Sequence, residues 1–156
     1  MLKLRFIVVD RTKAPFLAEG ESFFKKRLSR YARLEWIESK PVKIRKGDTN
    51  NRILTLEGES MVKSFLAKDH IIALDRSGKD YNSIELANHI NQLTFLHSQL
   101  VFVIGGPLGL SKAILTKAHE KLSLSKFTLT HEMSRLFLLE QLYRAFTILN
   151  GEKYHK

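Results

Sequence analysis

Three glycines follow an apolar run in the middle of the sequence, at Gly105, Gly106 and Gly109. Glycines let a ligand approach the backbone closely, because they carry no Cβ atom. The spacing is not that of a dinucleotide fingerprint, which needs glycines at the first, third and sixth places, and no Gly-Lys-Ser/Thr follows as in a Walker loop. Pro107 also removes one amide donor. These residues alone leave two interpretations open, a ligand cradle and a tight structural turn.

A second candidate for chemistry is the segment of residues 124–129, which directly precedes the longest helical pattern of the sequence. It consists of Leu124, Ser125, Lys126, Phe127, Thr128 and Leu129. Its hydroxyl and backbone groups could bind the edge of an adenine ring while the leucine and phenylalanine side chains cover the ring. A strand with alternating exposure explains the same residues and is favoured when the segment is considered by itself.

The six histidines show no spacing that suits a metal ion. None of them belongs to an H-x-E or H-E-x-x-H pattern, so we expect surface or capping histidines and infer no metal. His155 differs in its position, because it lies between Tyr154 and Lys156 at the end of the sequence. Terminal segments rarely carry aromatic side chains unless these dock somewhere. The tail is therefore a candidate for function.

Two arginines, Arg135 and Arg144, lie within an otherwise apolar helical pattern. They must reach solvent, a carboxylate such as Glu140, or a phosphate, and an ion pair is the favoured interpretation for each. The helix has apolar residues on several faces, which indicates that it is central to its domain or half-buried in a partner. We therefore expect it to form part of a dimer interface.

Strand patterns alternate with helical patterns along the whole sequence. Strands are expected at residues 4–9, 34–38, 70–75 and 100–104, the last being an apolar run typical of a parallel sheet covered on both faces. Helices are expected at residues 15–28, 52–66, 82–93, 111–120 and 130–150, with Asn82 and Glu85 as a capping pair. Residues 122–125 could be a strand or an extended loop. This order predicts one α/β domain, residues 1–156, with a mainly parallel open sheet that binds ligands at its carboxyl edge.

Basic residues exceed acidic ones, with 26 Lys and Arg against 16 Asp and Glu and a formal net charge of +10. Such a charge favours a polyanionic partner, because binding releases the counterions of the polyanion. Nucleic acid is the first candidate, and a solubilising surface or an anionic membrane are the alternatives. Residues 40–51 contain Lys40, Lys43, Arg45 and Lys46. They form either a basic arm that contacts RNA or a solvated connection.

The sequence contains no cysteine, which excludes disulfides, a zinc ribbon and a cysteine nucleophile and fits a reducing compartment. Its 156 residues, 44% of them hydrophobic, suffice for one sizeable core. The apolar run at residues 6–9 is too short for a signal peptide. No stretch approaches the ~20 apolar residues of a membrane span. We therefore expect a soluble, cytoplasmic protein.

Taken together, these segments resemble the RlmH family of SPOUT methyltransferases. The resemblance covers nearly the whole sequence, and the motifs that carry it are residues 73–75, 77–79, 102–110, 122–131, 135, 140–145 and 154–156. Each motif is weak alone, but their order and spacing in so short a chain are specific.

The resemblance implies an open α/β sheet whose C-terminal part is threaded as a trefoil knot, and a homodimer with donor sites near the interface. It implies S-adenosylmethionine as the methyl donor. The implied target is N3 of a pseudouridine in 23S ribosomal RNA, on the assembled ribosome. The donor site then falls on Leu74, Gly105 and residues 124–129.

Methylation at N3 requires loss of a proton from an imino nitrogen and stabilisation of the resulting charge. Our hypothesis is that Tyr154 and His155 position or deprotonate the base, while Arg144 and Lys156 hold a phosphate or the developing charge. If the dimer brings the tail to the neighbouring donor pocket, the active site is composite.

Two other functions fit parts of the sequence. The first is a basic RNA-binding or ribosome-associated protein without catalysis, in which the glycines form only a turn. The second is a nucleotide-binding oxidoreductase, which is disfavoured by the glycine spacing and by the absence of a suitably placed acidic residue for a ribose.

Overall fold

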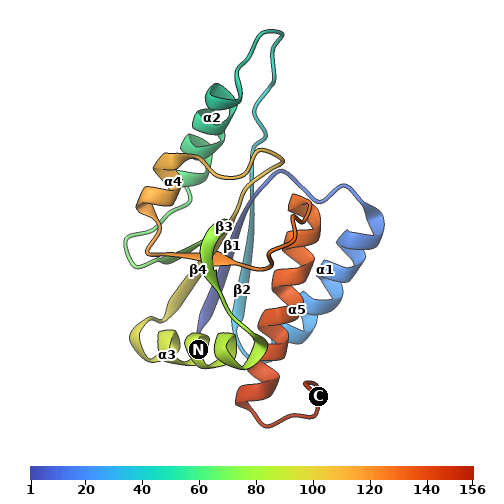
Figure 1. The fold of residues 1–156 in the computed structure, drawn as a ribbon. Coiled ribbons are helices and arrows are strands. Elements are labelled where there is room, and N and C mark those ends of the chain that lie inside the picture. The colour runs from blue at the N-terminus through green and yellow to red at the C-terminus, as the bar shows by residue number, and fades with distance from the viewer.

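The structure is a computed structural model that describes residues 1–156. Five strands and five helices alternate along the chain (Figure 1). Their order is β1 (Lys3–Val9), α1 (Pro15–Leu28), β2 (Arg33–Ser39), α2 (Asn50–Val62), β3 (His70–Asp80), α3 (Ser83–Leu96), β4 (Gln99–Ile104), α4 (Lys112–Lys117), β5 (Glu120–Ser123) and α5 (His131–Leu149).

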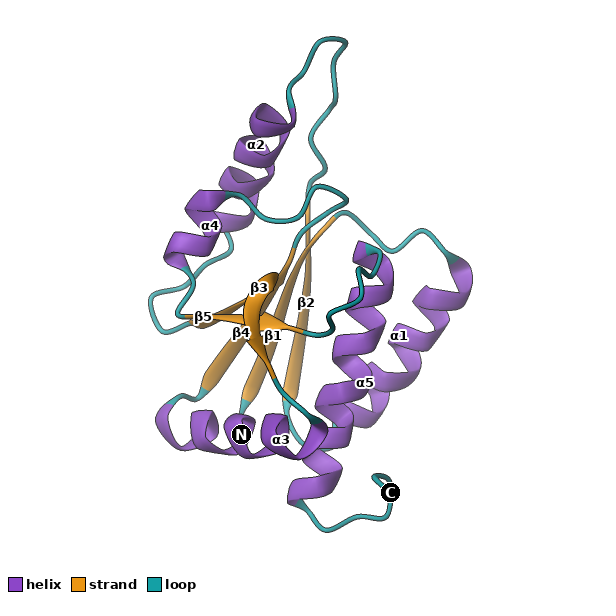
Figure 2. Ribbon diagram, viewed as in Figure 1, coloured by secondary structure: helices purple, strands orange, loops and turns teal.

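The strands form one sheet in the order β2-β1-β4-β3-β5, and every neighbouring pair is parallel. Figure 2 shows α1, α3 and α5 on one face of this sheet and α2 and α4 on the other. The predicted α/β class with a parallel sheet is therefore confirmed. The trefoil knot implied by the resemblance stays a prediction.

Alternate residues of the strands supply two cores. On β1, Phe6 and Val8 belong to the larger core under α1, α3 and α5, whereas Ile7 and Val9 belong to the smaller core under α2 and α4. All six residues of β4 are buried. This confirms that the apolar run at residues 100–104 is a central strand covered on both faces.

Local signals fix most of the helix starts. Asn82 and Glu85 form the predicted capping box at the start of α3, and the Thr130 hydroxyl accepts a hydrogen bond from the Met133 amide at the start of α5. The predicted helix at residues 111–120 ends earlier, at Lys117, because Glu120 already begins β5. Residues 120–123 are a strand, which decides between the two interpretations left open there.

Strand β3 is longer than predicted and contains a bulge. Both Leu74 and Lys79 pair with Leu122 of β5, so the residues between them are looped out of the ladder. The bulge brings Gly78 against β5, where a Cβ atom would lie 2.6 Å from the carbonyl carbon of Lys121. The strand predicted at residues 70–75 therefore continues through Ser77 and Gly78 to Asp80, because glycine permits this close backbone contact.

Helix α5 packs between α1 and α3 on the sheet (Figure 2). The predicted ion pair is confirmed for Arg144, whose Nη2 lies 2.6 Å from Oε1 of Glu140. It is wrong for Arg135, which is fully buried and donates instead to the Val9 carbonyl (2.5 Å) and the Thr12 hydroxyl (2.9 Å). The end of β1 runs beneath α5 and offers oxygen acceptors where no carboxylate is in reach.

A buried ion pair ties the amino edge of the sheet together. Nη1 of Arg5, in β1, lies 2.7 Å from Oδ2 of Asp69, and both side chains are almost completely buried. Asp69 also accepts hydrogen bonds from the side chain of Gln99 and from the Leu66 amide.

None of the helices combines the length and the apolar composition that crossing a membrane requires.

Replacing Arg5 by methionine is expected to lower the free energy of unfolding by about 3–5 kcal/mol, because it leaves the Asp69 carboxylate buried without its partner. Urea denaturation measures the change. The control is Lys3→Met, which removes a half-exposed partner of Glu35 and should cost less than about 1 kcal/mol. Equal losses for the two variants would contradict a dominant role of the buried pair.

Candidate functional site

The bulge within β3 and the loop that follows β5 enclose a small hollow at the carboxyl edge of the sheet. Its volume is about 100 Å³, and its lining consists of Leu74, Asp75, Arg76, Leu122, Ser123, Leu124, Ser125, Phe127, Thr128, Leu129 and Ser134. Six of the eight predicted donor-binding residues are in this lining. The structure thus brings Leu74 together with residues 124–129, although fifty residues of sequence separate them.

Strand pairing explains why these segments meet. Leu74 pairs with Leu122, and the chain after β5 turns back over the end of the pair towards α5. Within this segment the Ser125 hydroxyl accepts a hydrogen bond from the Phe127 amide (2.9 Å). This local turn leaves the Phe127 ring 85% exposed at the rim of the hollow. An apolar ring so exposed is available to cover a bound ligand or a second subunit.

The bulge of β3 supplies a charged side chain that the sequence did not single out. Nη1 of Arg76 donates a hydrogen bond of 2.6 Å to the Thr128 hydroxyl. The contact joins the loop after Leu74 to the segment before α5. Sequence reasoning selected the neighbouring Asp75 and Ser77 as motif residues, but only the bulge reveals that the intervening arginine faces the hollow.

The two remaining predicted donor residues, Gly105 and Lys126, do not line the hollow. Lys126 is exposed. Gly105 lies at the end of β4, the strand next to β3, in a turn in which the Gly109 amide donates to the Gly106 carbonyl (3.0 Å). A Cβ atom on Gly105 would lie 2.2 Å from the Gly109 carbonyl oxygen, so no other residue fits this turn. The glycines therefore form a tight turn, and no side chain of theirs covers its backbone.

A buried carboxyl group lies beside the glycine turn. Glu57 of α2 is 8% exposed, and its Oε1 atom has no hydrogen-bond partner. Burial raises the pKa of Glu57, and its Oε2 would lie 3.2 Å from a Cβ atom on Gly106. The sequence contained a signal for this residue, since Glu57 interrupts the buried helical stripe of Ile53 and Met61 at four-residue spacing.

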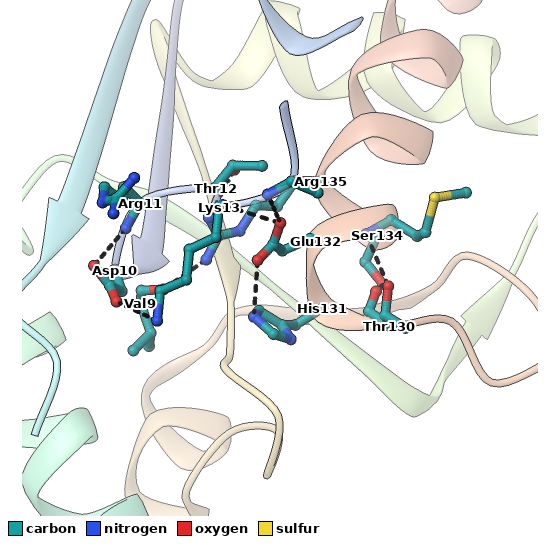
Figure 3. Close-up of polar contacts among 12 residues, drawn as sticks. Val9, Asp10, Arg11, Thr12, Lys13, Thr130, His131, Glu132, Ser134 and Arg135 are labelled. Carbon is teal, nitrogen blue, oxygen red and sulfur yellow. Dashed lines mark hydrogen bonds and ion pairs between the residues drawn. The ribbon is translucent and has the colours of Figure 1, made fainter. Parts of the chain in front are cut away.

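The loop between β1 and α1 forms the next part of the carboxyl edge (Figure 3). Asp10 has a φ of 63°, the only positive value on a residue other than glycine, and its carboxylate accepts from the Arg11 amide (2.8 Å). Glu132 of α5 accepts from the amides of Lys13 (3.1 Å) and Ala14 (3.0 Å). These bonds hold the Asp10 backbone in a conformation that costs on the order of 1 kcal/mol.

Three of the predicted catalytic residues gather around a single carboxylate in the middle of α5. Glu140 Oε1 lies 2.6 Å from Nη2 of Arg144 and accepts a hydrogen bond of 2.9 Å from the Tyr154 hydroxyl. Nη1 of Arg144 lies 3.2 Å from Nδ1 of His155. Lys156 is exposed at the terminus. The sequence had named Glu140 only as a partner for an arginine, whereas the structure makes it the centre of the cluster.

Burial, together with the hydrogen bond to Glu140, raises the pKa of the Tyr154 hydroxyl. The phenol therefore stays protonated at neutral pH and acts as a hydrogen-bond donor. The guanidinium of Arg144 lies 4.8 Å from the centre of the Tyr154 ring, which further fixes the tail. The cluster can donate hydrogen bonds and offer positive charge to a ligand.

The hollow and the tail cluster are separate sets of residues within one chain. Helix α5 borders the hollow with Ser134 in its first turn, whereas the tail folds back onto Glu140 and Arg144. At 1.5 Å per residue these two positions lie about 9 and 15 Å beyond Ser134 along the helix. The structure therefore assembles each predicted residue set but does not bring the two sets together within one chain.

Histidines cluster at the opposite, amino edge of the sheet. Nε2 of His70 and Nε2 of His89 lie 2.7 and 2.6 Å from the two carboxylate oxygens of Glu120. Burial opposes ionisation of Glu120, but these two contacts lower its pKa overall. His119 also has a hydrogen-bond partner, because its Nδ1 accepts from the Ile71 amide. No group of side chains in the chain has the arrangement of a metal site.

Comparisons with known proteins agree with this geometry. A family model described as "Predicted SPOUT methyltransferase" matches residues 2–155. A protein of Limosilactobacillus fermentum named "Ribosomal RNA large subunit methyltransferase H" is 39% identical over 160 residues, which cover 99% of this chain and 100% of the relative. A protein of Bacillus pumilus with the same name is 40% identical over 159 residues, with the same coverage.

Solved structures show a similar fold at low sequence identity. A probable methyltransferase from Bordetella pertussis Tohama I has a TM-score of 0.60 at 13% identity, covering 92% of this chain and 94% of the other. A probable methylase family protein from Haemophilus influenzae Rd KW20 has a TM-score of 0.57 at 15% identity, covering 98% of this chain and 70% of the other. With the full-length match to the family model, these findings identify the chain as a member of the RlmH family of SPOUT methyltransferases.

Proposed function

We propose that this protein transfers a methyl group from S-adenosylmethionine to N3 of a pseudouridine in large-subunit ribosomal RNA. The observation that carries the proposal is a hollow lined by both Leu74 and five of the residues 124–129. It occurs in a chain that belongs to this methyltransferase family. The relatives named as ribosomal RNA large subunit methyltransferases support the class of substrate. Residues 1–156 act as one methyltransferase domain, in the cytoplasm, where assembled ribosomes are found.

The residues of the hollow fit an adenosine-containing donor. Leu124, Phe127 and Leu129 offer apolar side chains, while Ser125 and Thr128 offer hydroxyl groups. Gly105 on the adjacent strand offers a backbone edge without a side chain, because a Cβ atom would collide with Gly109 there. Ligand pockets typically combine such an apolar lining with few polar groups, but they measure at least about 300 Å³. The smaller hollow therefore opens or is completed when the donor binds.

The bound donor supplies an electrophilic methyl group on a sulfonium sulfur. In the reaction the sulfur–carbon bond breaks, the bond from the methyl carbon to N3 forms, and the N3 proton leaves. Removal of this proton puts negative charge on the base, which a cation or a hydrogen-bond donor must stabilise. The tail cluster has the right groups: Tyr154 as hydrogen-bond donor, and Arg144 and Lys156 as cations for the base or its phosphate. Nδ1 of His155 accepts from Arg144 within the single chain, so His155 takes the proton only when the arginine turns to the RNA and frees this nitrogen.

A homodimer joins these two parts of the site. Within its own chain the tail is held against Glu140 and Arg144 and contributes no side chain to the hollow. A symmetric dimer in which α5 of one subunit runs against the partner would bring each tail to the neighbouring hollow, because both subunits use the same surface. The exposed Phe127 and Met133 near the hollow support an interface there. Each active site is then composite.

The basic loop supports binding to ribosomal RNA. Residues 40–49 connect β2 to α2 and extend away from the body of the protein (Figure 1). Lys43, Arg45 and Lys46 are exposed, and none of them contacts a carboxylate through its side chain. Cations free of acidic partners release counterions from RNA when they bind phosphates.

Replacing Gly105 by alanine is expected to weaken S-adenosylmethionine binding at least tenfold, or about 1.4 kcal/mol, because the added Cβ atom meets backbone atoms of Gly109 at 2.2 Å. Isothermal titration calorimetry measures the affinity. The control is Gly106→Ala, whose Cβ atom meets only side chains, Glu57 at 3.2 Å and Val9 at 3.7 Å, and which should keep most of the affinity. No donor binding by the unmodified protein, with RNA binding retained, would instead favour a non-catalytic RNA-binding protein.

Removing residues 154–156 is expected to abolish methylation of ribosomes while leaving donor affinity within about threefold, since the tail lies outside the donor hollow. A mixture of this variant with Gly105→Ala tests the composite site. In an equimolar mixture about half of the dimers are mixed, and each of these has one complete site, so about a quarter of the normal activity should return. Failure of the mixture to recover activity, with mixed dimers detected by native mass spectrometry, would contradict a shared site.

Replacing Lys43, Arg45 and Lys46 together by alanine is expected to weaken ribosome binding and to reduce the slope of log affinity against log salt by about 2–3, because three phosphate contacts are lost. Donor affinity should not change. Filter binding at several salt concentrations measures the slope. The triple variant of Lys26, Arg27 and Arg30, which removes the same charge near the end of α1, is the control; an equal effect there would mean that overall charge alone decides binding.

A further inference from the structure

The hollow at the carboxyl edge contains one acidic and one basic side chain, next to each other in the sequence. Asp75 and Arg76 both line it, and its nine other lining residues are uncharged. Both belong to the bulge of β3, which loops out between Leu74 and Lys79. The bulge therefore directs a carboxylate and a guanidinium towards the same small space.

Both side chains keep free hydrogen-bonding capacity. Oδ2 of Asp75 accepts from the amide and hydroxyl of Ser77, while Oδ1 accepts nothing from the protein. Arg76 uses only Nη1, in its 2.6 Å bond to the Thr128 hydroxyl. An arginine side chain has five N–H donors, so four remain available. The Thr128 contact thus fixes the guanidinium across the hollow without consuming its ability to bind an anion.

The methyl donor has one part whose charges match this pair. Its adenosine is neutral, but its amino-acid end carries an ammonium and a carboxylate group on one carbon atom. An arginine fork binds a carboxylate through two parallel hydrogen bonds, and a free carboxylate oxygen accepts from an ammonium group. Resting on the function proposed above, we propose that Arg76 and Asp75 bind the amino-acid end of the donor and determine specificity for it.

The arrangement also gives the donor an orientation. Leu124, Phe127 and Leu129 lie on the segment between β5 and α5 and offer apolar cover for the adenosine, while the charged pair lies on the β3 bulge. The amino-acid end then points to the bulge, and the sulfur lies between the two groups of residues. Adenosine compounds without this end lose the contacts to Arg76 and Asp75 but keep the rest.

Two neutral-sulfur compounds test the proposal by calorimetry, without any turnover. S-adenosylhomocysteine has the amino-acid end, and 5′-methylthioadenosine lacks it. The unmodified protein is expected to bind the first at least tenfold more tightly, as charge-assisted hydrogen bonds predict. Arg76→Met should reduce this preference about tenfold while leaving the affinity for 5′-methylthioadenosine unchanged, Asp75→Asn should reduce it less, and Arg76→Lys should keep part of it.

Two controls separate recognition from structure. Lys79→Met removes a positive charge from the same strand outside the hollow and should keep the preference. Thr128→Val removes the hydrogen bond that holds Arg76 across the hollow but leaves the charge, and should lower the preference less than Arg76→Met does. Equal binding of both compounds by the unmodified protein, or equal loss of both in Arg76→Met, would overturn the proposal while leaving the donor site intact. Binding of neither compound would overturn the donor site itself, and this proposal with it.

Discussion

The arrangement of the carboxyl edge depends on a buried arginine. The guanidinium of Arg135 is inaccessible to solvent and hydrogen-bonds to the end of β1 and to Thr12, while Glu132, one turn earlier on α5, accepts from two amides of the following loop. Moving the buried cation away from these acceptors would leave its charge without partners, so the contacts allow little freedom in the position of α5. The segment before α5 is then held between two fixed points, β5 and the helix start. Its turn over Leu74 forms the hollow.

The two edges of the sheet differ in how completely their polar groups are paired. At the amino edge the polar side chains are paired with each other, as in Arg5 with Asp69 and in the two histidines that share Glu120. At the carboxyl edge two buried polar atoms have no hydrogen-bond partner, Oε1 of Glu57 and Nε of Arg135, and Asp10 adopts an unfavourable φ. Unsatisfied groups and backbone strain are costly, and they persist where a site requires them. The contrast agrees with the general placement of ligand sites at the carboxyl ends of parallel strands.

Helix α5 carries both parts of the proposed active site, at different positions along its length. Its first turn borders the proposed donor hollow, and its middle turns carry the cluster around Glu140 and Arg144, none of whose residues is in the lining of the hollow. In the proposed dimer each active site takes its donor pocket from one subunit and its tail from the other. Under this proposal, donor binding belongs to the single subunit and catalysis to the pair.

The sequence by itself determined the α/β class, the positions of nearly all elements, the capping box of α3 and both loops of the proposed donor site. These follow from periodicity, glycine spacing and a resemblance carried by ordered motifs, all of which are local properties of the chain. Tertiary structure alone decided that Arg135 is buried without a carboxylate, that β3 bulges between Leu74 and Lys79, and that Arg76 faces Thr128. The physical reason is that a charged side chain and a strand register take their environment from segments distant in sequence. The sequence around an arginine does not indicate which distant residue its guanidinium group contacts.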